Sequence, residues 1–120
     1  MKTILIVEDV ELNRELLVQL LEDRYRLVLA GDGTAALDCA AREKPDLILM
    51  DLSLPRMDGW EATRCLKADA SLSKIPVIVL SARAMREDED RARSSGCDDF
   101  LAKPIDEAAL FHKLERHLGS

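Results

Sequence analysis

The sequence predicts an α/β protein in which a parallel β-sheet is covered by helices on both faces. Three nearly continuous apolar runs, residues 3–7, 46–51 and 76–80, are typical of strands that are buried on both sides, as in parallel sheets. Strand and helix patterns alternate five times along the chain. Because parallel strands are joined by right-handed crossovers, this alternation predicts a three-layer sandwich with a five-stranded sheet.

Capping and turn residues separate the predicted elements. Asp32 and Asp106 stand where a side chain would cap a following helix, and Gly96 stands where a helix would end. Pro76 opens a strand, a position at which its missing N–H group is tolerated. In chain order we expect strands at 3–7, 25–30, 46–51, 76–80 and 99–102, and helices at 11–23, 34–43, 60–69, 87–93 and from 106 to near the end.

Apolar residues recur at helical spacing in several of these helices and predict which side faces the sheet. The stripes consist of Leu12, Leu16, Leu17, Leu20 and Leu21 in the first helix, Ala62, Cys65 and Leu66 in the third, and Ala109, Leu110, Leu114 and Leu118 in the last.

Length and composition restrict the class of protein. The 120 residues predict one domain, spanning 1–120 without an output domain. A net charge of -6 argues against binding to nucleic acid or to an anionic membrane surface. No stretch approaches the length of a membrane span, and the apolar N-terminal run is too short for a signal peptide. The three cysteines lack zinc-site spacing, so we expect reduced thiols in a cytoplasmic protein.

Polar residues stand where four of the predicted strands end. Glu8 and Asp9 follow the first strand, Asp51 ends the third, Ser81 follows the fourth and Lys103 follows the fifth. The carboxyl ends of parallel strands share one edge, so these groups are expected to meet there. Clustered carboxylates require a positive partner, and magnesium prefers such oxygen ligands.

Asp51 has the chemistry of a nucleophile toward phosphorus, since carboxylates form aspartyl-phosphates in other proteins. A metal, a lysine and a hydrogen-bond donor stabilise the charge on a transferred phosphoryl group. Taken singly, an Asp or Ser after a strand is usually a cap or turn residue, and Lys-Pro is usually a solvated loop. Their joint occurrence at successive strand ends favours a phosphoryl-acceptor site.

Five motifs resemble those of the receiver domains of two-component response regulators. They are Ile-Val-Glu-Asp (6–9), Asp-Leu-Ile-Leu-Met-Asp (46–51), Leu-Pro-Arg-Met-Asp-Gly (54–59), Val-Leu-Ser-Ala (79–82) and Lys-Pro (103–104). The resemblance covers essentially the whole chain and implies a flavodoxin-like (βα)5 fold with strand order 2-1-3-4-5. The segment 8–13 is more similar to stand-alone, DivK-like single-domain regulators than to the chemotaxis type.

The resemblance also implies roles for individual residues. Asp51 would accept a phosphoryl group from a phosphohistidine, and Phe100 would act with Ser81 as a conformational switch, although Phe100 as a fixed core residue remains an alternative. The implied ligands of Mg²⁺, for which Mn²⁺ is a substitute, are Asp9, Asp51 and the main-chain carbonyl of Ser53, with Glu8 acting through water. Ser81 would bind the phosphoryl group, and Lys103 would neutralise its charge. Pro104 would follow a cis peptide bond.

A receiver of this kind acts through protein partners and is not an enzyme beyond Mg²⁺-dependent self-phosphorylation and self-dephosphorylation. The implied partners are a histidine kinase, a histidine phosphotransfer protein, or both, docking near Val10, Asn13 and Leu17; the alternative for Leu17 is a core position. The start Met and compact end favour a stand-alone regulator. The alternative is the receiver module of a hybrid histidine kinase, acting as a phosphorelay intermediate. A phosphatase with an Asp nucleophile is disfavoured because Ser53, rather than a second acid, stands two residues after Asp51.

Overall fold

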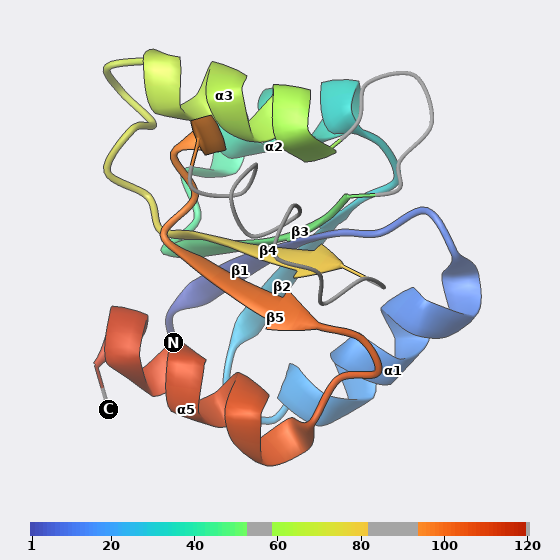
Figure 1. Cartoon of the computed structure of the whole chain (residues 1–120). Coiled ribbons are helices and arrows are strands. Elements are labelled where there is room, and N and C mark those ends of the chain that lie inside the picture. The colour runs from blue at the N-terminus through green and yellow to red at the C-terminus, as the bar shows by residue number, and fades with distance from the viewer. Residues whose placement is uncertain (53–58, 82–93, 120) are drawn as a thin grey trace.

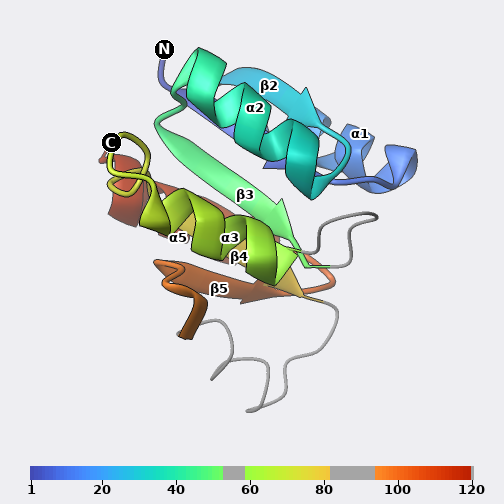
Figure 2. The same ribbon diagram turned by 90° about the horizontal axis from the view of Figure 1, so that it is seen from above.

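The computed structural model describes residues 1–52, 59–81 and 94–119 as three layers (Figures 1 and 2). Within these ranges no helix is long and apolar enough to cross a membrane, and the cytoplasmic location stays a prediction. The helix expected at 87–93 falls outside the described residues.

The elements are β1 (Thr3–Val7), α1 (Glu11–Leu21), β2 (Arg26–Ala30), α2 (Gly33–Glu43), β3 (Leu47–Asp51), α3 (Gly59–Ala68), β4 (Val77–Ser81), β5 (Asp99–Ala102) and α5 (Glu107–Leu118).

The sheet confirms the predicted topology. All four strand pairs are parallel, and the strand order is β2-β1-β3-β4-β5. Helices α2 and α3 cover one face, and α1 and α5 cover the other (Figure 1). Because every strand runs in the same direction, all five carboxyl ends lie along a single edge, which we call the carboxyl edge.

Local signals place the helix ends where the sequence predicts them. The Asp32 side chain accepts a hydrogen bond from the main-chain N–H of Ala35 at 2.7 Å and caps α2. Asp106 caps α5 in the same way, accepting from Ala108 at 2.9 Å. Gly96 has a φ of 88°, the left-handed conformation that glycine adopts readily. The peptide bond between Lys103 and Pro104 is cis, as predicted.

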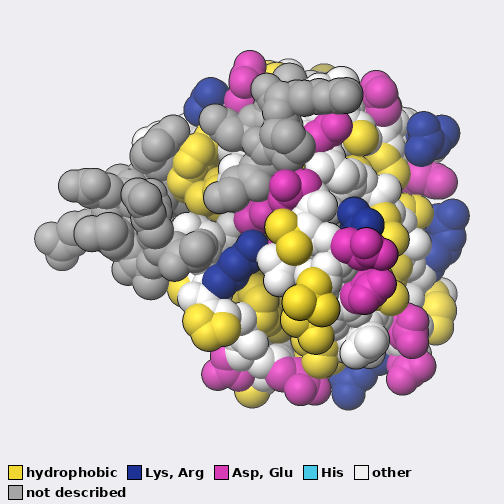
Figure 3. Space-filling view, turned by 90° about the vertical axis from the view of Figure 1, so that its right-hand side faces the viewer, with side chains coloured by type: hydrophobic (Ala, Val, Ile, Leu, Met, Phe, Trp, Pro, Cys, Tyr) yellow, Lys and Arg dark blue, Asp and Glu magenta, His cyan; other side chains and the backbone are white. Residues whose placement is uncertain are grey.

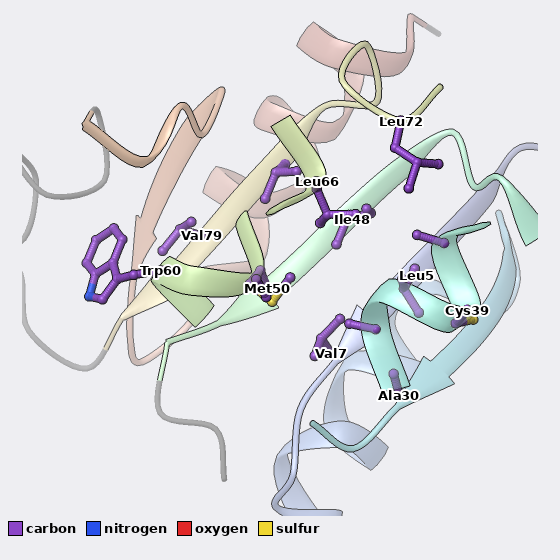
Figure 4. Close-up of a cluster of buried hydrophobic side chains, with 14 residues drawn as sticks. Leu5, Val7, Ala30, Cys39, Ile48, Met50, Trp60, Leu66, Leu72 and Val79 are labelled. Atoms are coloured by element: carbon purple, nitrogen blue, oxygen red, sulfur yellow. The ribbon is translucent and has the colours of Figure 1, made fainter. Parts of the chain in front are cut away.

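The sheet separates two hydrophobic clusters, because successive side chains of a buried strand point to opposite faces. The cluster beneath α2 and α3, which we call the α2–α3 core, includes Ile48, Met50 and Val79 (Figure 4). The cluster on the α1 and α5 side includes Leu47, Leu49 and Ile78, among others. The all-apolar strands therefore serve both cores, which is why they lack polar alternation.

The predicted stripe of α1 is too wide. Leu17 and Leu21 are buried against the sheet, as an amphipathic helix requires, but Leu12 and Leu16 are 65% and 52% exposed. Positions 16 and 17 are about 100° apart around a helix, so only one of the two rows of leucines can face the core. The alternative of a core position is correct for Leu17, and the unexpected feature is an exposed pair of leucines.

The inward position predicted for Cys65 is also wrong. Cys65 is exposed, whereas Ala62, Thr63 and Leu66 are buried. Residue 65 lies one helical step away from the buried row, which includes Thr63. The buried Thr63 hydroxyl is satisfied because it donates a hydrogen bond to the Gly59 carbonyl at 2.7 Å. Of the remaining cysteines, Cys39 is buried and Cys97 is half-buried.

Gly59 allows the first turn of α3 to lie directly against the end of β3. A Cβ atom at this position would lie 2.4 Å from the carbonyl oxygen of Asp51 and 2.8 Å from the Cα of Leu52. Both neighbours are backbone atoms of the sheet, so they cannot turn aside as a flexible side chain can. Any larger residue at position 59 must therefore move α3 away from Asp51.

We expect Gly59→Ala to reduce the free energy of unfolding by about 1–3 kcal/mol, because the added methyl group overpacks a backbone contact. Denaturant unfolding measured by circular dichroism checks this. Gly31→Ala is the matched control, since nothing lies within 4 Å of its Cβ position, and its effect should stay within about 0.5 kcal/mol. Equal effects of the two substitutions would contradict the account of close approach.

Candidate functional site

Four neighbouring strands deliver polar groups to the carboxyl edge. Glu8 and Asp9 follow β1, Asp51 is the last residue of β3, Ser81 is the last residue of β4, and Lys103 follows β5. Figure 3 looks onto this edge, where acidic side chains lie beside basic ones and hydrophobic side chains border them. The structure thus brings to one edge the residues that the sequence assigned to four separate strand ends.

Main-chain hydrogen bonds extend the sheet beyond the strands and fix these residues in place. The N–H of Glu8 donates to the carbonyl of Ala30 at 3.1 Å. The N–H of Lys103 donates to the carbonyl of Ser81 at 2.7 Å. The chain after each strand is therefore held in register at the point where the polar side chains begin.

Lys103 is the cation of the site. Its Nζ donates hydrogen bonds to Asp51 Oδ1 at 3.0 Å and to Glu8 Oε1 at 3.3 Å. Both acids are removed from solvent, Glu8 with 0% and Asp51 with 3% of its surface exposed. Ion pairs that are buried in this way are screened little by salt, so Lys103 holds the two carboxyl groups in a fixed geometry.

The electrostatics of the site reflect an excess of acids. Burial, together with the hydrogen bond and negative charge of Asp51, raises the pKa of Glu8 to about 7, although Lys103 opposes the shift. Burial disfavours the charge on Lys103, but the hydrogen bonds and charges of Asp51 and Glu8 outweigh this effect and raise the pKa of Lys103. One lysine therefore does not fully compensate the acids gathered around it.

The acids fit a hard divalent cation. One carboxylate oxygen from each of Glu8, Asp9 and Asp51 lies within 4.8 Å of the others. Magnesium takes a small number of carboxylate ligands and fills its other positions with water or phosphate oxygens. Asp9 is exposed, which leaves room for such ligands on the solvent side.

The other predicted site residues differ in what the structure shows of them. Ser81 is buried at the end of β4, one residue beyond Leu80, the neighbour of Asp51 in the sheet. Phe100 lies on β5 beside Val79, half-buried against the α2–α3 core. Ser53, predicted to supply a main-chain carbonyl to the metal, lies outside the described residues.

A groove of about 660 Å³ opens beside the acids, between α1 and the segment that joins β5 to α5. Glu8 and Lys103 line its polar end, and leucines of α1 line much of the rest. Of the predicted docking residues, Asn13 and Leu17 line this groove, and Val10 is exposed at the start of α1. The exposed Leu16 also lines the groove, which sequence reasoning missed because it assigned this leucine to the buried stripe.

Three further contacts were not apparent from the sequence. Arg14 Nη1 donates to the main-chain carbonyl of Glu8 at 3.2 Å and so ties α1 to the site. On β5, Asp99 forms an ion pair with Lys113 at 2.7 Å, and its Oδ2 lies 3.0 Å from His117 Nε2, within hydrogen-bond distance. His117 is half-buried, whereas His112 is exposed. In the sequence, Lys113 and His117 are related by their spacing, which places them one turn apart on α5. No such spacing relates them to Asp99.

Comparison with protein families gives one match over most of the chain. Residues 4–115 match the model of the response regulator receiver domain. The chain is 43% identical over 119 residues to the polar-differentiation response regulator DivK of Brucella anthropi, and the match covers 98% of this chain and 97% of that protein. DivK of Brucella abortus is similar to the same degree.

Solved structures agree with this similarity. The receiver domain of a sensor histidine kinase from Pseudomonas aeruginosa, which has a magnesium ion coordinated in its active site cleft, is 38% identical with a TM-score of 0.91, covering 99% of this chain and 98% of that one. The receiver domain of a histidine kinase from Syntrophus aciditrophicus is 35% identical with a TM-score of 0.92, covering 98% and 90% of the two chains.

The raised pKa of Glu8 predicts that stability falls as pH rises. The folded protein holds a proton on Glu8 up to about pH 7, whereas the unfolded chain releases it near 4.5. Without metal, the free energy of unfolding should therefore decrease by about 3 kcal/mol between these two pH values. Denaturant unfolding in EDTA over this range measures the slope. Glu8→Gln, which has no proton to lose, should flatten it, and a slope that persists in this variant would refute the assignment.

Proposed function

The chain belongs to the response regulator receiver domain family and serves as a phosphoacceptor in two-component signalling, and from this premise we propose that Asp51 is the residue that accepts the phosphoryl group. The observation that carries the proposal is the short contact between Lys103 Nζ and Asp51 Oδ1 at 3.0 Å. It places a fixed cation on the one carboxylate that ends a central strand, at the point where phosphoryl charge would develop. This family is not a classical enzyme family.

The proposed reaction is a displacement at phosphorus. A bond forms between an Asp51 oxygen and the phosphorus atom as the nitrogen–phosphorus bond of a phosphohistidine donor breaks, and the electron pair stays on the departing imidazole. Lys103 neutralises the added negative charge, and the Ser81 hydroxyl donates a hydrogen bond to a phosphoryl oxygen. The rigid, fully buried β3 keeps Asp51 in position during the transfer.

The proposed metal is Mg²⁺, with Mn²⁺ as a substitute, held by Asp9, Asp51 and the main-chain carbonyl of Ser53. The clustering of the carboxylate oxygens and the magnesium ion in the related receiver from Pseudomonas aeruginosa support this choice. When bound, the ion supplies charge stabilisation for the phosphoryl group and permits the same acids to act in self-phosphorylation and self-dephosphorylation. Because Glu8 is buried and paired with Lys103, it acts on the ion indirectly.

The proposed phosphodonor is a helical domain of a histidine kinase or a histidine phosphotransfer protein. Leu12 and Leu16 leave an apolar ridge exposed on α1, and the groove beside it leads to Glu8 and Lys103. An amphipathic helix that buries its apolar side against this ridge would place its own polar residues near Asp51. The overall negative charge of the chain gives no reason to add nucleic acid or a membrane surface to the partners.

The similarity to DivK favours a single-domain regulator over the module of a hybrid kinase. The chain matches DivK across 97% of the length of that protein, and its 43% identity exceeds the 38% and 35% identity to the two kinase receiver domains. We accordingly assign residues 1–120 to one receiver domain that switches the binding of a partner, with Ser81 and Phe100 as the moving side chains.

The direct test is phosphorylation by acetyl phosphate in the presence of Mg²⁺, followed by intact mass spectrometry. The wild type should gain one phosphoryl group, and Asp51→Asn should gain none, because an amide is not a nucleophile toward phosphorus. Asp46→Asn, at the opposite end of the same strand, is the control and should be phosphorylated like the wild type. A wild type that gains no phosphoryl group would refute the proposed function.

The metal assignment predicts that Asp9→Asn weakens Mg²⁺ binding by about tenfold or more, because one charged ligand is lost. Competition of Mg²⁺ with Mn²⁺, followed by electron paramagnetic resonance, measures the affinity. Glu11→Gln removes an exposed acid two residues further along and should change the affinity by less than about twofold, since its charge is screened by solvent. Similar losses of Mg²⁺ affinity in both variants would show that the general negative charge attracts the ion, and would contradict coordination by Asp9.

A further inference from the structure

Trp60, the single tryptophan of the chain, belongs to the α2–α3 core, against which the proposed switch residue Phe100 of β5 also packs. It follows Gly59 in the first turn of α3, and its side chain is only 6% exposed. Among the labelled side chains of the α2–α3 core, the indole lies beside Val79 of β4, over the part of the sheet nearest β5 (Figure 4).

Val79 connects this tryptophan to Phe100. Val79 and Phe100 are register partners on β4 and β5, so their side chains point to the same face of the sheet. Phe100 packs half-buried against the cluster that contains both Val79 and Trp60. Ser81 lies two residues beyond Val79 on that face. An inward movement of Phe100 toward Ser81 therefore takes its ring toward the space beneath the first turn of α3.

The position of the indole is fixed from the other side by the acceptor strand. The N–H of Gly59 donates to the carbonyl of Leu52 at 3.2 Å, and no Cβ fits between Gly59 and the Asp51 carbonyl. Thr63 closes the same turn through its hydrogen bond to Gly59. The first turn of α3 thus cannot shift without disturbing the backbone of Asp51.

We propose that Trp60 is a positioning residue that keeps Phe100 in its outward, half-buried position until Asp51 is phosphorylated. The inference rests on the proposed function, because it concerns the switch that phosphorylation of Asp51 operates. Its physical basis is packing: the indole occupies volume that the Phe100 ring needs in order to bury itself completely. Replacing Trp60 with leucine leaves a void beside a ring that gains free energy by burial, so the ring should fill the void without phosphorylation.

Fluorine NMR can test this directly, because the chain has only two phenylalanines, Phe100 and Phe111. Protein labelled with 4-fluorophenylalanine should give two resonances, and Phe100→Leu assigns them. Phe111 packs in the cluster on the α1 and α5 side, with the Arg24 guanidinium 4.4 Å from its ring centroid. It therefore serves as an internal control whose resonance should not move.

With acetyl phosphate and Mg²⁺, the Phe100 resonance of the wild type should move. In unphosphorylated Trp60→Leu it should already lie about half of the way or more toward the phosphorylated position. The rate of phosphorylation by acetyl phosphate, measured by intact mass, should stay within about twofold of the wild type, because Trp60 belongs to the α2–α3 core and is not one of the residues proposed to bind the metal or the phosphoryl group.

Leu66→Ala is the control for general loosening of the same core. Leu66 is 1% exposed on the same helix, and its truncation should lower stability without moving the Phe100 resonance. If Trp60→Leu does not fold, Trp60→Phe makes a smaller void and should give a smaller shift in the same direction.

The outcomes separate this inference from the proposed function. If the wild type is phosphorylated but its Phe100 resonance stays in place, or if Trp60→Leu leaves that resonance at the unphosphorylated wild-type position, the role of Trp60 is refuted while the function of Asp51 stands. An equal shift in Leu66→Ala also refutes it. If the wild type gains no phosphoryl group, the proposed function fails, and this inference fails with it.

Discussion

Two buried carboxyl groups share one lysine at the carboxyl edge of the sheet, and most of the architecture serves this arrangement. Glu8 and Asp51 come from neighbouring strands, and Lys103 reaches both from the far end of the chain at 3.3 and 3.0 Å. Acids held this close repel one another unless a cation lies among them, so the geometry requires a rigid support. The fully buried β3 and β4 and the almost completely buried β1 provide that support, since each belongs to both hydrophobic cores.

The proposed switch uses the same support to connect Asp51 on β3 with Phe100 on the edge strand β5. Gly59 lets α3 contact the backbone of Asp51, and the following Trp60 packs in the core that Phe100 borders. Rigid contacts of this kind carry a displacement between sites because packed cores deform little and adopt discrete arrangements. The acceptor and the proposed switch are thus parts of one mechanical unit, with α3 between them.

The sequence predicted the elements that are repetitive and failed where the outcome depends on neighbours in space. Apolar runs identified the strands, and the polar residues that follow them identified the groups that meet at the carboxyl edge. The order of the strands came from the resemblance to the receiver family. Leu12 and Leu16 were misassigned because helical periodicity reports spacing along one helix and not the width of the surface it covers. The ion pair of Asp99 with Lys113 and its hydrogen-bond contact with His117 likewise depend on tertiary packing that no local pattern encodes. The same is true of the contact that excludes a Cβ at Gly59.

In α1, the leucines that stabilise the fold are different residues from the leucines that are exposed on the surface. Leu17 and Leu21 hold α1 to the sheet, whereas Leu12 and Leu16 contribute little to the core, so exchanging the latter pair opens no cavity. If a partner docks on this ridge as proposed, substitutions at Leu12 and Leu16 change which partner is recognised while the fold keeps its stability. A duplicated copy of the gene could therefore acquire a new partner, and be insulated from the old one, by changing a few positions on one helix without compensating changes elsewhere.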